Sequence, residues 1–155
     1  MYRVKNTTIS LVFLAGLTAL SACKTTSNAN MDDTWSNVTA QQWQLVQVTQ
    51  SKNNSNPLVP TPPVMATAQF SPAGTVSGNA GCNQYSGSYT QAGTSLDVLQ
   101  LATTRKMCLD EHAMKIEDAL TGAFVLVDQW DLVNGHLVLN DQDGDKLIEF
   151  APAAP

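Results

Sequence analysis

The sequence predicts an α+β domain that is mainly β, with one helix laid against a curled antiparallel sheet. Short stretches of alternating apolar and polar residues recur from residue 42 onward, with turn residues between them, which is typical of antiparallel strands. Only the segment 110–127 differs, because its apolar residues fall at steps of three and four, the spacing of one helical face. The chain has 155 residues, a length that corresponds to one domain.

The N-terminus is expected to be an export signal followed by a lipid attachment site. Two basic residues precede the apolar run "ISLVFLAGLTAL" and then small residues, as in a secretory signal peptide. The run is shorter than the ~20 residues that a membrane-spanning helix needs. The following "LSAC" resembles a bacterial lipobox, so residues 1–22 should be removed and Cys23 should carry an acyl anchor. Lys24 follows the cysteine in place of Asp, which by resemblance to enterobacterial sorting favours an outer-membrane lipoprotein facing the periplasm, with surface exposure as the alternative.

Residues 23–40 are expected to be the acylated cysteine and a flexible tether. The stretch "KTTSNANMDDT" at 24–34 has almost no large apolar group, and such a composition does not support a core. The folded domain is therefore expected to occupy residues 41–152, with its first core residues between Trp35 and Trp43.

The charge of the chain argues against nucleic acid as a partner. The formal net charge is −5, and loss of Arg3 and Lys5 with the leader lowers it by two, to −7. Basic residues are scattered, with Arg105 and Lys106 as the only adjacent pair. Binding to phosphates needs a clustered cationic face, so we expect no such partner.

The strand pattern continues to the C-terminus. The stretches expected as strands are 43–48, 64–71, 85–90, 95–101, 130–133, 136–140 and 145–150. The proline-rich stretch 51–63 is expected to be a loop, and the turn at 72–74 leads into "TVSGNAG". Asn134-Gly135 between two apolar stretches is the strongest hairpin signal.

The helix is expected to begin at Asp110 and to end between Phe124 and Asp128. Its apolar face consists of Ala113, Ile116, Leu120, Phe124 and Val127. Asp110 and Glu111 lie in the first turn, where acids interact favourably with the helix dipole.

Three separated motifs resemble one family. The stretches "GNAGCNQYSGSYT", "LATTRKMC" and "LVLNDQDGDKLIEF" closely resemble the META domain (HslJ-like) family of bacterial envelope lipoproteins. The resemblance covers residues 43–150 and implies a small antiparallel, partly open β-barrel with one helix, no established catalytic activity and no cofactor. It also implies a link to heat-shock response, antibiotic tolerance or virulence. The family-motif residues are Gly81, Cys82, Asn83, Tyr85, Gly87, Tyr89, Thr104, Arg105 and Cys108.

Cys82 and Cys108 are expected to form a disulfide. Acylation of Cys23 leaves these two thiols, and an exported compartment is oxidising. A disulfide is favoured over two alternatives. One is a nucleophilic cysteine with His112 or His136 as its base. The other is a zinc site of both cysteines and His112, which Glu111 would have to complete.

Three further groups have a structural interpretation that we favour over a functional one. Asp141, Asp143 and Asp145 alternate as calcium ligands do, but Lys146 and Pro152 occupy positions where an EF-hand has glycine and glutamate. Thr103, Thr104 and Arg105 precede the helix; the arginine is expected to pair with Asp110 or Glu111 rather than to bind an anion. Trp35, Trp43, Trp130, Tyr85 and Tyr89 are expected to form core rather than to line an apolar pocket.

The sequence therefore predicts a non-enzymatic, lipid-anchored envelope protein that supports envelope integrity, stress tolerance or antibiotic tolerance through protein or ligand binding. The alternative is a carrier or chaperone for an apolar ligand, a lipid or acylated peptide, held between sheet and helix. No metal and no catalytic residue are expected. The expected partners are the membrane, through the acyl anchor, and an envelope protein or apolar ligand.

Overall fold

The computed structural model describes residues 31–49 and 56–154. The leader 1–22, Cys23, residues 24–30 of the expected tether and part of the proline-rich loop therefore lie outside the described residues.

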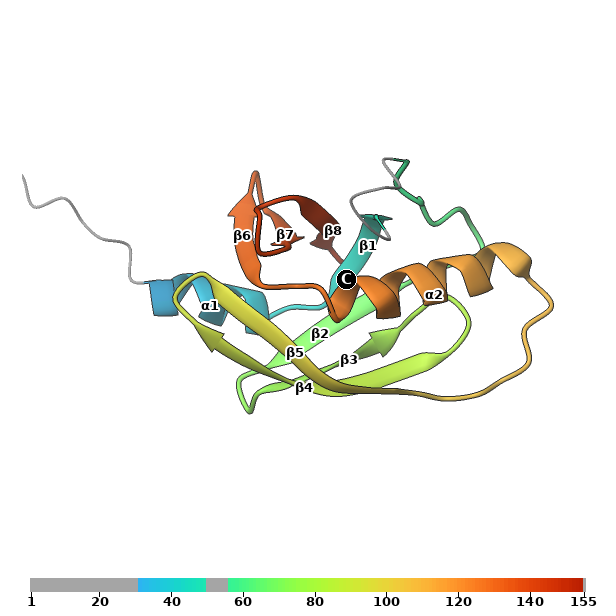
Figure 1. Ribbon diagram of the computed structural model, residues 1–155, viewed down its shortest axis with the longest axis horizontal. Coiled ribbons are helices and arrows are strands. Elements are labelled where there is room, and N and C mark those ends of the chain that lie inside the picture. The colour runs from blue at the N-terminus through green and yellow to red at the C-terminus, as the bar shows by residue number, and fades with distance from the viewer. Residues whose placement is uncertain (1–30, 50–55, 155) are drawn as a thin grey trace, which may run out of the picture.

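Eight strands follow one another around a single antiparallel sheet that closes on itself (Figure 1). They are β1 (Trp43–Val48), β2 (Thr67–Ser71), β3 (Thr75–Asn79), β4 (Gln84–Ala92), β5 (Ser95–Thr103), β6 (Gln129–Val133), β7 (His136–Asn140) and β8 (Lys146–Pro152). The ring is uneven, because β5 and β6 share a single register pair, Ser95 with Gln129, whereas β4 and β5 pair along almost their whole length. The sheet is therefore a closed ring without the regularity of a barrel, and the expected fold class is confirmed.

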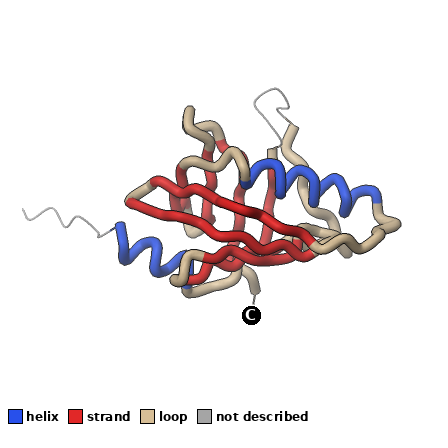
Figure 2. Tube along the Cα trace, turned by 60° about the horizontal axis from the view of Figure 1, so that its bottom comes forward, coloured by secondary structure: helices blue, strands red, loops and turns tan. Residues whose placement is uncertain are grey.

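The helix α2 (Glu111–Phe124) connects β5 to β6 and packs against β1 and β8, lying across one side of the strands (Figure 2). Asp110 is its N-cap, since its carboxylate accepts hydrogen bonds from the backbone amides of His112 (2.9 Å) and Ala113 (3.1 Å). Its apolar face, including Ile116 and Leu120, is fully buried. The apolar face of the helix and its C-terminal end at Phe124 both agree with the sequence-based expectation.

The core fills the inside of the ring because the side chains of each strand alternate between its two faces. Phe70, Val76, Leu137 and Phe150 are among the inward residues with no exposed surface. Among the described residues, no buried side-chain nitrogen or oxygen lacks a hydrogen-bond partner. The interior is thus packed and its polar groups are satisfied.

The helix α1 (Met31–Thr39) was not predicted. It lies inside the segment 23–40 that we assigned to a tether, and its Trp35 and Val38 are buried. Trp35 packs edge-on against Phe70, Tyr89 and Trp130, with ring centroids 5.4, 5.4 and 4.8 Å apart. The low apolar content of the segment concealed two side chains that share one helical face at spacing i, i+3.

Trp35→Ala should lower the free energy of unfolding by about 3–5 kcal/mol, the usual cost of removing a large buried aromatic side chain. The indole also donates a hydrogen bond to the Tyr89 hydroxyl at 3.2 Å, which the variant loses. Urea unfolding measures the change, with Asn37→Ala on the exposed side of the same helix as control. Equal stability of the two variants would show that α1 is not part of the cooperative unit.

Candidate functional site

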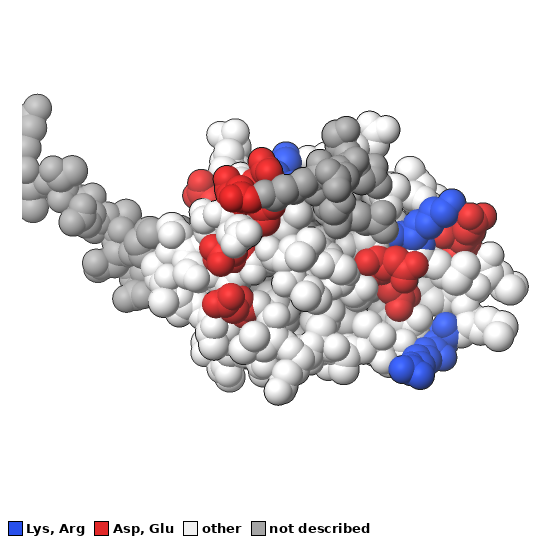
Figure 3. Space-filling view, viewed as in Figure 1, with Lys and Arg blue, Asp and Glu red and all other residues white. Residues whose placement is uncertain are grey.

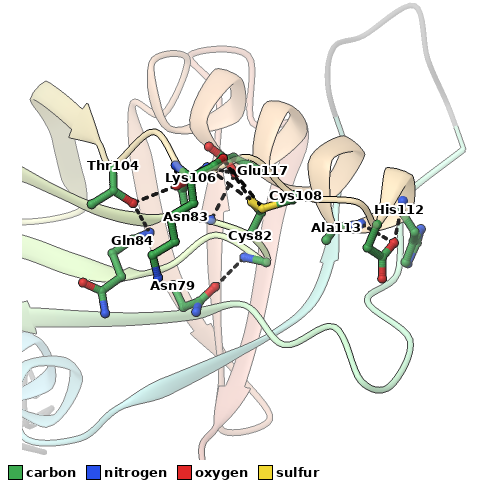
Figure 4. Close-up of a disulfide and its surroundings, with 12 residues drawn as sticks. Asn79, Cys82, Asn83, Gln84, Thr104, Lys106, Cys108, His112, Ala113 and Glu117 are labelled. Atoms are coloured by element: carbon green, nitrogen blue, oxygen red, sulfur yellow. Dashed lines mark hydrogen bonds between the residues drawn. A yellow bond between two sulfur atoms is a disulfide. The ribbon is translucent and has the colours of Figure 1, made fainter.

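Four of the family-motif residues lie together where the β3–β4 turn, the segment 104–110 and α2 meet, namely Cys82, Asn83, Thr104 and Cys108 (Figure 4). A disulfide joins Cys82 in the turn to Cys108 in the segment, with Cα atoms 6.2 Å apart. The predicted pairing is therefore confirmed. Because the bridge closes a loop across 26 residues of sequence, the chain-entropy model gives it a stabilisation of about 3.5 kcal/mol.

The side chain of Asn83 is the polar centre of this region and is 6% exposed. Its Oδ1 accepts hydrogen bonds from the Lys106 backbone N–H at 2.7 Å and from the Thr104 hydroxyl at 2.8 Å. Its Nδ2 donates to Glu117 Oε2 at 3.0 Å. One amide thus ties the turn to the segment 104–110 and to the helix.

Glu117 is a member of this site that the sequence did not reveal. Its Oε2 also accepts from the Asn83 backbone N–H at 3.1 Å, so one carboxylate oxygen serves both the backbone and the side chain of the asparagine. The residue follows the buried Ile116 and is itself half-buried. The sequence places Glu117 at the border of the apolar face of the helix, but no sequence pattern predicts its contact with Asn83.

Two motif glycines permit close approaches of the backbone. Gly81 has φ +107°, and a Cβ there would lie 3.0 Å from the carbonyl oxygen of Ala113 in α2. At Gly87 a Cβ would lie 3.0 Å from the carbonyl oxygen of Leu99, beside the register shift between β4 and β5. A side chain at either position would make an unusually tight contact and would force its neighbour to shift by a few tenths of an ångström. At Gly81 the positive φ favours glycine as well.

The motif tyrosines point into the ring. The hydroxyl of Tyr85 donates to the Thr67 carbonyl at 2.9 Å, and that of Tyr89 donates to the Ser71 carbonyl at 2.6 Å. Burial raises the pKa of both phenols above its ordinary value of 10.0, so neither serves as a base near neutral pH. The indoles of Trp43 and Trp130 likewise donate to backbone carbonyls, at 2.9 and 3.0 Å. The five aromatic residues named from the sequence are core.

The alternatives that required a free thiol or a metal find no support. The disulfide occupies both cysteines. His112 Nε2 lies 3.2 Å from the Val59 carbonyl oxygen, and His136 Nδ1 lies 2.8 Å from Glu149 Oε1. Within residues 31–49 and 56–154 no group of three or more His, Cys, Asp or Glu side chains could hold a metal ion.

The acidic stretch 141–145 forms the β7–β8 turn. Asp141 is buried, and its Oδ1 accepts from the backbone amides of Asp143 at 2.9 Å and of Asp145 at 3.0 Å. These bonds give Asp141 the turn-forming role that we favoured from the sequence.

The expected ion pair of Arg105 is not formed. Asp110 caps α2, and Glu111 pairs with Lys115 one helical turn later at 2.8 Å. Each acid therefore already has a local partner. Arg105 is exposed, while its neighbour Thr104 also accepts a hydrogen bond from the Gln84 backbone N–H at 3.1 Å.

A polar groove of about 610 Å³ is lined by Gln42 and by residues of the segment β2–β5 and Thr104 after it. Its lining residues are mostly small or uncharged polar: Gln42, Thr67, Ser77, Gly78, Asn79, Gln84, Tyr85, Ser86, Ala102, Thr103 and Thr104. Because Ser77 pairs with Ser86 across β3 and β4, their outward side chains lie side by side in the groove. None of the lining residues is charged.

A polar cluster around the carboxylate of Glu149 joins β1, β7 and β8 on another part of the sheet. Glu149 accepts hydrogen bonds from Lys146 Nζ at 2.6 Å and from Gln47 Nε2 at 2.8 Å, in addition to its contact with His136. The bond from Lys146 and then the contact with His136 lower the pKa of Glu149 from 4.5 to about 2. The cluster links three strands through their outward side chains.

Fold and site together define a small antiparallel β-ring protein in which the motif residues hold the framework together. The family model of the META domain matches residues 36–154, and the chain belongs to the META domain family. It is similar to a protein from Burkholderia xenovorans solved by NMR, with 25% identity, a TM-score of 0.64, and coverage of 81% of this chain and 90% of that one. A second protein solved by NMR, 19% identical over 76% of this chain and 92% of its own length, has a TM-score of 0.54 and shows the same fold.

No curated protein matches the chain. The META domain is not a known enzyme family. Among the described residues, neither helix has the length and apolar character needed to cross a membrane.

Asn83→Ala should lower the free energy of unfolding by about 2–4 kcal/mol, because the Lys106 amide and the Glu117 carboxylate each lose a partner. A double-mutant cycle with Glu117→Ala should give a coupling energy of about 1 kcal/mol or more. Gln84→Ala, the exposed neighbour of Asn83, is the control and should change stability by less than about 0.5 kcal/mol. Additive effects of the Asn83 and Glu117 variants would mean that their contact has no energetic role.

Glu149→Gln should destabilise the protein by about 1–2 kcal/mol at pH 7, since hydrogen bonds to a charged group are lost. The folded-state pKa is depressed to about 2, so the contribution is complete above the ordinary value of 4.5 and disappears as the pH falls toward 2. Urea unfolding of both proteins between pH 7 and pH 2 measures the difference. If the difference in unfolding free energy between the two proteins stays constant over this range, Glu149 does not have a lowered pKa in the folded state.

Proposed function

We propose that the protein is a non-enzymatic, lipid-anchored protein of the bacterial cell envelope. In this role it supports envelope integrity, stress tolerance or antibiotic tolerance by binding a partner protein or ligand. The polar groove on β2–β5 carries the proposal, because it is a hollow of about 610 Å³ lined mainly by small or uncharged polar side chains, most of which are exposed.

A binding role agrees with the observation that the cysteine and asparagine side chains of the motif are engaged in structural contacts. The two cysteines form the disulfide, and the amide of Asn83 is occupied by structural hydrogen bonds. In the groove itself hydroxyl and amide groups predominate. Such groups exchange hydrogen bonds with neutral polar ligands and supply no general base.

The alternative of an apolar-ligand carrier has less support. The space between α2 and the sheet is occupied by Leu120, Phe124 and Phe150, none of which has exposed surface. The ring of Phe124 lies 5.4 Å from that of Tyr85 and 6.3 Å from that of Phe150. These contacts are those of a packed core.

The lipid anchor is supported by "LSAC" at residues 20–23. Residues 24–30 separate Cys23 from α1, and seven residues span at most about 25 Å when fully extended. Since Trp35 of α1 is part of the core, an acylated Cys23 would hold the whole domain close to the membrane.

Intact mass measurement of the chain purified from membranes tests the anchor. The expected mass is that of residues 23–155 with acyl groups on Cys23, and Cys23→Ser should abolish this modification. A mature N-terminus with an unmodified cysteine would refute anchoring.

Complementation of a deletion strain under envelope stress tests the groove. Ser77→Arg places a long charged side chain in the groove and should abolish complementation without changing the unfolding temperature, because Ser77 is exposed. Thr90→Arg, on the same outer face of β4 but outside the groove, should complement as the native protein does. Full activity of Ser77→Arg would place the function elsewhere.

A further inference from the structure

The segment between β5 and α2 presents an unusual combination of exposed side chains. We define residues 105–109 as the tip loop. Met107 and Leu109 are 94% and 98% exposed, and the preceding Arg105 and Lys106 are exposed as well. Single exposed apolar residues are common on protein surfaces, but here two of them flank a disulfide cysteine and adjoin two cations.

The backbone of the tip loop is fixed from several sides. The disulfide holds Cys108, which lies between Met107 and Leu109. Asn83 accepts from the Lys106 backbone N–H and donates to its carbonyl at 3.4 Å. Because the loop is ordered before any contact, binding through its side chains loses little conformational entropy.

The charges around the tip loop favour an anionic partner. Its two neighbouring acids, Asp110 and Glu111, are occupied by the helix cap and by Lys115. Figure 3 shows basic side chains at the lower right, where the chain from β5 to α2 runs in Figure 1; acidic side chains gather at the upper left, and others lie above this basic group on the right. Although the chain has a net charge of −5, its adjacent basic pair Arg105 and Lys106 lies in the tip loop.

We propose that the tip loop is a lipid-contact site that inserts Met107 and Leu109 into an anionic bilayer surface. Arg105 and Lys106 bind the lipid phosphates there. Apolar side chains beside lysine and arginine are the chemistry of interfacial membrane contact, and each cation near an anionic leaflet adds attraction. Val59, which is 50% exposed and whose carbonyl contacts His112 on α2, adds apolar surface at the same end.

The small size of the tip loop favours a bilayer over a protein as its partner. A stable protein interface covers about 800 Å² on each side and about 20–30 residues, whereas the tip loop offers four exposed side chains. Shallow insertion into a lipid surface needs no larger area, because the bilayer surrounds each inserted side chain.

The site extends the proposed acyl anchoring without depending on it. The tip loop and α1 lie at opposite ends of the long axis of the molecule in Figure 1. Contact at both ends would place this axis along the membrane.

Tryptophan fluorescence in vesicles containing lipids with brominated acyl chains tests the proposal. The full chain is purified from membranes as Met107→Trp and reconstituted in vesicles of phosphatidylethanolamine and phosphatidylglycerol, or of phosphatidylcholine alone. The native Trp35, Trp43 and Trp130 are buried and give a constant background. The loss of fluorescence for Met107→Trp should be several-fold greater in anionic than in zwitterionic vesicles, and it should diminish at high salt.

Val133→Trp, at the exposed end of β6, is the matched control and should lose no more fluorescence than the native protein. Adding Arg105→Glu and Lys106→Glu to Met107→Trp should remove the extra loss in anionic vesicles. Equal quenching at both positions, no quenching at residue 107, or quenching that survives the charge reversal would overturn the proposal. Flotation with zwitterionic vesicles, together with the mass of the purified chain, reports the acyl anchor separately.

Discussion

The hydrogen bonds of Asn83 are the constraint on which the arrangement of this protein depends. Its amide binds the segment 104–110 on one side and Glu117 of α2 on the other, while the adjacent Cys82 is covalently bound to Cys108. Because α2 is the element between β5 and β6, these bonds position the helix against the ring. Because β6 follows α2 in the chain, they also help to set the position at which β6 to β8 begin. A buried amide with all these partners is costly to replace, since each lost contact leaves a polar group without a bond in a poorly hydrated site.

Most of the motif residues serve the framework, although Tyr85 and Thr104 also line the groove and Arg105 and Cys108 belong to the tip loop. Gly81, Cys82 and Asn83 shape the framework and present little reactive chemistry to solvent. The features that the framework leaves exposed are the groove on β2–β5 and the side chains of the tip loop. This division means that members of a family with such motifs can share a fold while their outward side chains determine what each of them binds.

Much of the fold could be predicted from the sequence because alternation and helical spacing are local signals. The strands around Trp43 and Leu137, the apolar face of α2 and the disulfide all followed from residue type and order. The helix α1 was missed because its stability comes from Trp35 packing on residues distant in sequence, which composition does not report. The contact of Asn83 with Glu117 and the free side chain of Arg105 depend on the same three-dimensional arrangement. The groove was also missed, since its lining residues come from four different strands and from Gln42 and Thr104 outside them.

The closure of the ring by β1 and β8 has a consequence for how the chain reaches its folded state. Trp43 pairs with Pro152 and Val48 with Ile148, so the first strand has one of its two partners at the far end of the domain. The strands β2 to β5 pair with sequence neighbours and close short loops, whereas β1 and β8 close the longest one, at a greater entropic cost. In a chain that emerges N-terminus first, from a ribosome or through a translocation pore, β1 can pair with β2 early, but its other edge stays open until β8 has emerged. The last residues to arrive are those that complete the ring.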